Sequence, residues 1–391
     1  MPNAPASSKQ DLSGTRTMSI VKVAVEPMGV RLEFQSSRLE SLDVFRGIAI
    51  VGMLLVISPG SGEYVYGALR HAEWNGFTFA DLVFPLFVFT VGIAAALSLS
   101  KRIERGEKKG KILIKIAIRT VILFTLGLMV NGLWYGLPLR VMGIFQRLAL
   151  CYFFTSIIFM NIARFRALMA SAAILLLSYW ILMRFVPVPG YGPGVLEKNG
   201  NLAAYLDGFL LREHTYHQQT WDPEGLLSTM PAIATCLSGA FTGQWILSPR
   251  NRTKKVLGMV SMGWMGILLG LVWNIDFPIN KNLWSSSYVV FTAGIMLLMF
   301  AFCYWLVDIK GWGILTKPLA ILGRNALAIY LMSDATKYVL MKSSTWTRLY
   351  LGLCGLIPDP AVASLLYTII YILVWLDVTA LLYRKGITIK I

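Results

Sequence analysis

The segment 69-LRHAEWNGFTFADLVFP-85 concentrates polar side chains between two strongly apolar runs. It holds His71, one of three histidines in a chain of 391 residues. An imidazole titrates near neutral pH, so it can accept a proton from a nucleophile or attack an acyl carbon itself. Asn75 and Asp81 add hydrogen-bonding groups, and Trp74 adds a flat apolar face that suits a sugar ring. The pattern indicates acid–base or acyl-transfer chemistry, although a solvated loop histidine and a helix cap at Asp81 are the plainer interpretation.

Further charged residues stand within or beside apolar runs, where each costs about 2.5–3.5 kcal/mol unless it faces a cavity or a partner. Arg147 and Arg324 are the hardest to explain by contact with headgroups, because both stand inside apolar segments. Glu224 follows Asp-Pro and is expected in the first turn of a helix, where it could act as a cap. The charged residues that could line one polar cavity are Asp43, Arg46, Asp81, Arg119, Arg147, Glu224 and Arg324.

The composition predicts that the chain is a membrane protein. The chain is 56% hydrophobic and 14% charged, whereas a soluble domain carries about 25% charged residues. Apolar runs of about 20 residues span a bilayer as helices, which satisfy all of their own backbone groups. We therefore expect an all-α, polytopic bundle of about ten transmembrane helices. The predicted spans are 41–58, 81–100, 112–132, 142–161, 168–186, 226–247, 256–274, 283–307, 318–333 and 362–383.

The net charge of +16 does not indicate nucleic-acid binding, because the basic residues gather in short loops. The loops 101–111, 164–166 and 250–255 follow alternate predicted helices. Such loops face the cytoplasm in membrane proteins. This places both termini in the cytoplasm and the segment 59–80, with His71, on the far side.

The chain is expected to consist of a disordered cytoplasmic tail over residues 1–37 and one membrane domain over residues 38–391. The tail has no clean apolar core of the kind found in secretory signal peptides. The four cysteines form no CxxC pair and are interpreted as small buried side chains. His214 and His217 have no third ligand marked nearby, so no metal site is predicted.

Six segments occur in order from about residue 38 to the C-terminus: RLESLDVFRG, LRHAEWNGFTFADLVFPLFVFTVG, GIFQRLALCYF, TWDPEGLLSTMPAIATCLSG, PINKNLWSSSYVVFTAG and LGRNALAIYL. Together they resemble the heparan-α-glucosaminide N-acetyltransferase family. The resemblance implies transfer of acetyl from cytoplasmic acetyl-CoA to a glucosamine amine across the membrane, with His71 as the active histidine of the HAxWNG motif. One departure is that Ile57 and Ser58 stand in VISPG, where the family has an asparagine that assists the histidine.

The resemblance and the residue chemistry together assign expected roles. His71 is either the base for direct attack by the amine or a transient acyl carrier, and Ser58 or Asn75 stabilises the oxyanion. Asp81 orients His71 or holds the sugar ammonium. The residues expected near CoA are Asp43, Arg46, Arg119, Gln146, Arg147 and Arg324. The residues expected near the amino sugar are Trp74, Asp222, Glu224, Asn280, Lys281 and Trp284.

Two other functions fit the same residues. A permease for an amino sugar of the inner membrane would use the polar cavity without chemistry, and a membrane scaffold would have lost activity at Ile57 and Ser58. The partners expected are acetyl-CoA, a small amino sugar and membrane lipid, without nucleic acid. A homodimer formed through small-residue helix faces is also compatible with the sequence.

Overall fold

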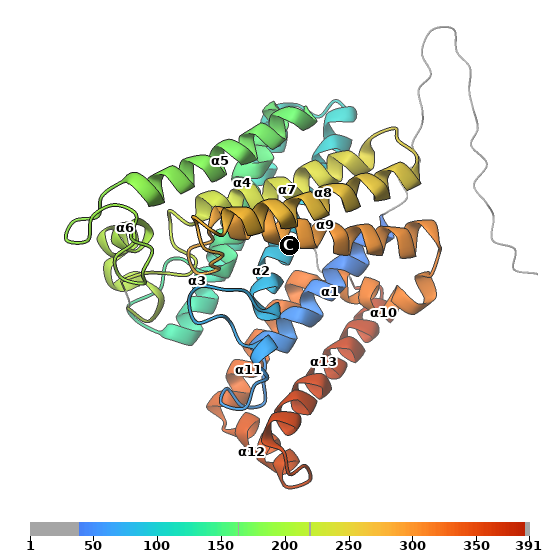
Figure 1. The fold of residues 1–391 in the computed structure, drawn as a ribbon. Helices are drawn as coiled ribbons and strands as arrows, with labels where there is room; N and C mark the ends of the chain where they lie inside the picture. The colour runs from blue at the N-terminus through green and yellow to red at the C-terminus, as the bar shows by residue number, and fades with distance from the viewer. Residues whose placement is uncertain (1–38, 163, 219, 388–391) are drawn as a thin grey trace, which may run out of the picture. The chain divides into compact units, whose positions relative to one another are not determined.

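The computed structural model describes residues 39–162, 164–218 and 220–387, which form α-helices and connecting loops. The predicted tail 1–37 lies outside these residues. Within them the regular structure is helical, apart from one isolated β-bridge between Val188 and Gly192. The all-α prediction is therefore confirmed (Figure 1).

Ten of the described helices are 17 residues or longer, and seven segments are long and apolar enough to cross a membrane. The chain is thus an integral, multi-pass membrane protein. Helix α1, with three charged residues, is among the long helices outside the seven. The helices are α1 (Glu40–Ile57), α2 (Phe79–Glu104), α3 (Lys109–Tyr135), α4 (Ile144–Asn161), α5 (Phe165–Phe185), α6 (Leu202–Leu210), α7 (Thr229–Leu247), α8 (Arg252–Trp273), α9 (Ser286–Tyr304, continued by a π-helical turn, Trp305–Ile309), α10 (Gly313–Arg324), α11 (Ala326–Lys342), α12 (Thr345–Cys354) and α13 (Pro360–Arg384).

The predicted span 318–333 is wrong, because the chain breaks at Asn325 into α10 and α11. Helix α10 packs across α1 at two glycines. A Cβ atom at Gly323 would lie 1.8 Å from the carbonyl oxygen of Asp43, and one at Gly47 would lie 2.0 Å from that of Leu319. This backbone-to-backbone contact fixes α10 on α1 and leaves α11 free to take another direction.

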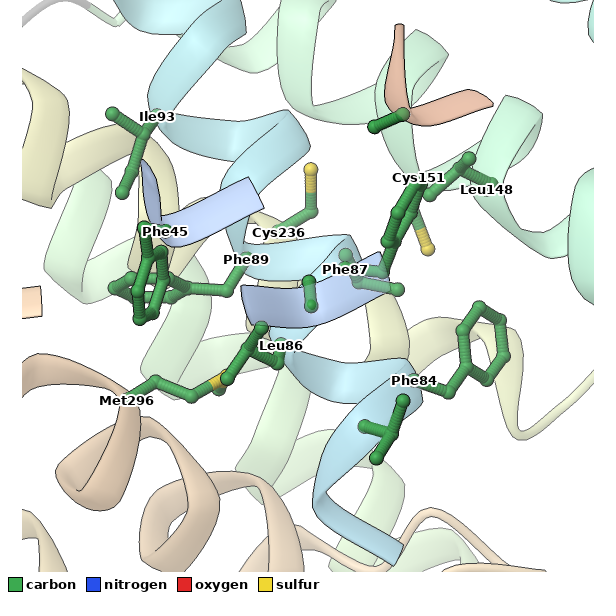
Figure 2. Close-up of a cluster of buried hydrophobic side chains, with 14 of the residues drawn as sticks. Phe45, Phe84, Leu86, Phe87, Phe89, Ile93, Leu148, Cys151, Cys236 and Met296 are labelled. Carbon is green, nitrogen blue, oxygen red and sulfur yellow. The ribbon is translucent and has the colours of Figure 1, made fainter. Parts of the chain in front are cut away.

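Helix α2 is the centre of the bundle and contacts α1, α3, α4, α7 and α9. Its first four turns are buried on nearly every side, which explains an apolar run without a polar face. Figure 2 shows Phe84, Phe87 and Phe89 leaving α2 toward different neighbours, with Phe45 beside Phe89. The rings of Phe45 and Phe89 meet edge to face at 6.2 Å. The helix that carries Asp81 is therefore held rigidly.

Small residues let α7 approach α2. A Cβ atom at Gly92 would lie 1.9 Å from the carbonyl oxygen of Cys236, and one at Gly239 would lie 2.0 Å from that of Phe89. Helices α8 and α9 lie side by side along their length, with Gly263 and Gly294 at their contact (Figure 1). Close approach at small residues is typical of helices in membranes, where van der Waals contact drives packing.

Three long connections lie at the same end of the bundle as the N-terminus of α2. They are 58–78, 186–228 and 274–285. The connections at the opposite end are short. The four cysteines are free, and three are buried, in agreement with their interpretation as small apolar residues. The bundle thus presents one end rich in loops, where the polar segment around His71 lies.

Candidate active site

His71 and Asp81 form a hydrogen-bonded pair at the start of α2. Nδ1 of His71 lies 2.8 Å from Oδ1 of Asp81. The second carboxylate oxygen of Asp81 accepts hydrogen bonds from the backbone N–H groups of Ala72 and Thr78, and Thr78 is the N-cap of α2 in a capping box. Asp81 is 1% exposed, whereas the side chain of His71 is 45% exposed. Asp81 therefore caps the helix and is hydrogen-bonded to the imidazole at the same time. The predicted cap and the predicted contact with His71 are compatible.

The loop before α9 brings a lysine to the same imidazole. Nζ of Lys281 lies 3.4 Å from Nδ1 and 3.3 Å from Nε2 of His71. The neighbouring Asn280 is buried, and its amide donates to Oδ1 of Asn75 at 3.1 Å. The backbone N–H of Gly76 donates to the carbonyl of Ile279 at 2.9 Å. These bonds join the two loops, so Lys281 is held where it can act on any group bound at His71.

Trp74 closes another side of this site. Its indole N–H donates to the carbonyl oxygen of Leu196 at 2.9 Å, and its ring meets Trp221 edge to face at 5.2 Å. Lys198 lies 5.9 Å from the ring centroid. The long connection between α5 and α7 therefore packs against the His71 loop, and Trp74 is held by contacts to it.

Asp222 and Glu224 are both bonded to Arg140, which sequence reasoning missed. Arg140 donates from Nε and Nη2 to the two carboxylate oxygens of Asp222, at 2.9 and 2.6 Å, and from Nη2 to Glu224 at 2.6 Å. Its guanidinium lies 4.7 Å from the ring centroid of Tyr216. All three charged side chains are buried. Glu224 also lies in the loop before α7, so its predicted place in the first helical turn is wrong.

Glu224 and Lys281 act on each other electrostatically, which connects the Arg140 cluster with the site around His71. Burial alone would raise the pKa of Glu224, but Arg140, Arg147 and Lys281 together lower it, so the carboxylate stays ionised. Burial lowers the pKa of Lys281, while Glu224 and Asp81 act in the opposite direction. Two carboxylates therefore favour the charged form of Lys281, and one of them, Asp81, also holds His71.

Arg147 and Trp284 lie in the core and contact each other. The guanidinium of Arg147 is 4.9 Å from the Trp284 ring, and its Nη2 donates to the carbonyl of Gly225 and to the hydroxyl of Ser228. Both side chains are fully buried, and the indole N–H of Trp284 donates to Thr235 at 3.0 Å. The structure thus places Arg147, expected near CoA, behind the loop that carries Glu224, and it places Trp284 away from any open surface.

Three of the residues expected near CoA line one cavity of ≈ 270 Å³ between α1, α2, α3, α4 and the α10–α11 break. They are Arg46, Arg119 and Arg324, and no acidic residue lines the cavity among the residues that the structure describes. Asp43 lies just outside, 3.7 Å from Arg46 and 3.7 Å from Arg324. Apolar side chains of α2, α3 and α4 complete the wall. The cavity can therefore hold a group with both anionic and apolar parts.

Gln146 and Ser58 are buried and contact neighbouring helices. Gln146 packs between α3 and α4, where a Cβ atom at Gly127 would meet its amide oxygen at 2.5 Å. Ser58 is buried at the end of α1, and its carbonyl accepts a hydrogen bond from Thr368 at 3.1 Å. The carbonyl of Ile57 accepts from the ammonium of Lys337. The backbone at Ile57 and Ser58 is therefore bonded to α11 and α13.

Known proteins resemble this chain over most of its length. A family described as a domain of unknown function (DUF5009) matches residues 38–141. The heparan-alpha-glucosaminide N-acetyltransferase of Homo sapiens is 32% identical over 362 residues, which cover 78% of this chain and 54% of the relative. The protein of the same name from Mus musculus is 31% identical over 351 residues, or 75% of this chain and 53% of the relative. The chain spans about half the length of these curated relatives.

Proposed function

Because this chain is homologous to the heparan-α-glucosaminide N-acetyltransferases, we propose that it is a transmembrane N-acetyltransferase. It moves an acetyl group from acetyl-CoA to the amine of a glucosamine-type sugar. The observation that carries the proposal is the His71–Asp81 pair, held rigidly at the start of α2 with Lys281 beside the imidazole.

The donor is assigned to the cavity lined by Arg46, Arg119 and Arg324. Guanidinium groups bind phosphate strongly through paired, charge-assisted hydrogen bonds. Thr90, also in the cavity wall, lies nine residues along α2 from Asp81. That separation is about 14 Å at a rise of 1.5 Å per residue. An extended pantetheine arm crosses a distance of that order, so the phosphates stay in the cavity while the thioester reaches the histidine.

The proton path follows from the pairing of His71. Asp81 accepts the Nδ1–H, so the lone pair at Nε2 is available as a base. Nε2 takes a proton from the sugar ammonium, and the neutral amine attacks the thioester carbonyl. The C–N bond forms and the C–S bond breaks, and His71 gives its proton to the departing thiolate. His71 then accepts the remaining extra proton from the new amide nitrogen and releases it to solvent, so each turnover yields one H⁺. Lys281 lies beside Nε2 and stabilises the negative charge that develops on the carbonyl oxygen.

An acyl-imidazole on His71 is the alternative path. In that path Nε2 attacks the thioester first, CoA leaves, and the amine then takes the acetyl group. The two paths differ in one measurement. Purified protein given acetyl-CoA without a sugar releases one equivalent of CoA if the acyl-imidazole forms, and releases none if the amine attacks directly.

The orientation is proposed from the charge of the loops. The segments 101–111, 164–166 and 250–255 face the cytoplasm, as do both termini, and His71 faces the opposite compartment. The arginine cavity then opens toward the compartment that contains acetyl-CoA. Single cysteines placed at 106 and at 73, in a variant whose four native cysteines are replaced by serine, test this, since a membrane-impermeant reagent on intact cells should label only the second.

The activity is tested with purified protein in proteoliposomes, radiolabelled acetyl-CoA and glucosamine. Wild type should yield labelled N-acetylglucosamine, and His71→Ala should lower the rate by about 10²–10⁴-fold, because it removes a positioned base. His217→Ala, in the connection between α6 and α7, is the matched control and should stay close to wild type. Movement of unlabelled sugar without acetyl transfer would instead identify a permease and sink the proposal.

A further inference from the structure

A second cavity, of ≈ 470 Å³, lies at the opposite end of α2 from His71. It is formed where α2 and α7 end and where α5 and α8 begin. Its wall combines two arginines, one carboxylate, two hydroxyl groups and two aromatic rings. The residues that carry these groups are Ser100, Glu104, Phe165, Arg166, Trp245, Ser248 and Arg250.

The aromatic part of this wall is fixed in place. The indole N–H of Trp245 donates to the carbonyl of Lys255 at 3.0 Å, and its ring lies 5.7 Å from that of Phe165. A Cβ atom at Gly258 would lie 2.3 Å from the indole ring, so α8 packs directly on it. Arg250 lies over the same ring, with its guanidinium carbon 4.2 Å from the centroid. This stacking holds one cation at the cavity wall.

The second cation lies at the start of α5. Arg166 is in the first turn of this helix, where no side chain caps the N-terminal N–H groups. Such a helix end attracts anions through its free N–H groups and its dipole. Two guanidinium groups and a helix N-terminus therefore converge on one cavity, which is an arrangement suited to a phosphate.

Glu104 adds a negative charge at the end of α2, where it also lines the cavity. A carboxylate beside two arginines is unfavourable for a ligand that carries only negative charge. It is favourable for a ligand in which an ammonium stands close to the phosphate. The charges of the wall thus match a zwitterion that joins a phosphodiester to a primary amine.

Apolar surface borders the cavity where a lipid tail would lie. Leu247, in the cavity wall, is 39% exposed. Met169, one turn beyond Phe165 on α5, is also 39% exposed, and Leu257, next to Gly258 on α8, is 60% exposed. A tryptophan such as Trp245 at the end of a membrane helix is typical of the headgroup layer.

We propose that this cavity binds a phosphoethanolamine headgroup, with Arg166 and Arg250 on the phosphate and Glu104 on the ammonium. The favoured source is a phosphatidylethanolamine molecule of the surrounding membrane, because apolar surface continues from the cavity onto α5 and α8. The site lies apart from His71 and from the cavity lined by Arg119, so it does not depend on acetyl transfer.

The test is native mass spectrometry of the purified full chain. The protein is released from detergent in the presence of equal amounts of phosphatidylethanolamine, phosphatidylcholine and phosphatidylglycerol, which share the same acyl chains. Phosphatidylethanolamine should be retained about tenfold more than phosphatidylcholine, a difference of about 1.4 kcal/mol. The double variant Arg166→Gln, Arg250→Gln should lose this retention. Glu104→Gln should lose the preference for the primary amine while it retains phosphatidylglycerol. Lys254→Gln, an exposed cation that does not line the cavity, is the control.

Equal retention of the three lipids, or an unchanged pattern in the double variant, would overturn the proposal. Thermal unfolding of each variant checks that it is folded. A second arm adds soluble glycerophosphoethanolamine at millimolar concentration. Displacement of the lipid supports recognition of the headgroup and identifies a soluble ester as a competing source. No displacement, with retention of the lipid as expected, shows that the acyl chains are required as well.

Discussion

Two groups of arginines in this chain differ in what their guanidinium groups face. Arg140 donates to two carboxylates, Asp222 and Glu224, and is almost fully buried. Arg119 and Arg324 line a cavity, and each lies over a tyrosine ring. A guanidinium whose donors are bonded to protein carboxylates holds loops together, whereas one that faces a cavity keeps donors for a ligand. The number of arginines near a site therefore says less than what is bonded to each.

Removing Arg140, which is bonded to Asp222 and Glu224, should have the largest effect on stability. Arg140→Leu leaves the carboxylates of Asp222 and Glu224 buried without their cation, which costs about 3–5 kcal/mol. Thermal unfolding in detergent should show a clear fall in the midpoint. The exposed pair of Arg184 and Asp276, 3.4 Å apart, offers the control. Arg184→Gln should cost less than about 1 kcal/mol, since exposed pairs are screened by water. Equal midpoints for the two variants would contradict the distinction.

Changing an arginine that faces the cavity should affect the ligand. Arg119→Gln should raise the KM for acetyl-CoA about tenfold, equivalent to about 1.4 kcal/mol of lost binding, with little change in the unfolding midpoint. Arg324→Gln should raise KM as well and also lower the midpoint, because Arg324 lies 3.7 Å from the buried carboxylate of Asp43. Steady-state kinetics with glucosamine in excess measures this. Lys115→Gln, one helical turn from Arg119 and paired with Glu107, should leave KM unchanged. A fall in the stability of Arg119→Gln without a change in KM would show that Arg119 holds the fold together, as Arg140 does.

An effect that depends on pH is expected at Asp207, which lies on α6 close to the carboxylate of Asp222. Burial raises the pKa of Asp207 to about 7, and its Oδ1 accepts the backbone N–H of Leu226 at 2.9 Å. Because the folded state binds the proton more tightly than the unfolded state, stability falls as pH rises from about 4 to about 7. Asp207→Asn keeps the acceptor but cannot ionise, so its advantage over wild type should grow across that window.

The gain should appear as a higher unfolding midpoint for Asp207→Asn than for wild type at pH 8, and as a smaller difference at pH 5. Unfolding curves of both proteins at pH 5 and pH 8 measure it. A constant difference between the two proteins at both values would show that Asp207 ionises normally.

The long helices could be predicted from the sequence because each apolar run is about as long as a bilayer is thick. Nine of the predicted spans agree with observed helices to within four residues at each end. The break at Asn325 could not be predicted in the same way, because ILGRNALAIYL is apolar on both sides of it. Gly323, two residues before the break, packs against α1 in a tertiary contact that no local pattern records.

The candidate site divides in the same way. The prediction that His71 and Asp81 act near each other rested on a separation of ten residues across one loop, and the structure brings them to 2.8 Å. Arg140 was missed because it stands in the turn LPLRVMG and looked like an ordinary residue of a loop. The available signal was the pair of acids in WDPEG, which need a cation if they are buried. Arg147 was assigned to CoA because its sequence neighbours are apolar, yet its contacts come from the loop before α7 and from Trp284.

The break between α10 and α11 limits how much of the polar lining of the arginine cavity can be removed by mutation. Gly323, Asn325 and Ala326 line the cavity, so the start of α11 borders it. The N–H groups that begin α11 therefore lie beside the carbonyl groups that end α10 at Arg324, and these two ends carry opposite partial charges. Side-chain replacement leaves peptide groups in place. A chain stripped of all three cavity arginines therefore keeps both a donor and an acceptor end of the main chain at the cavity.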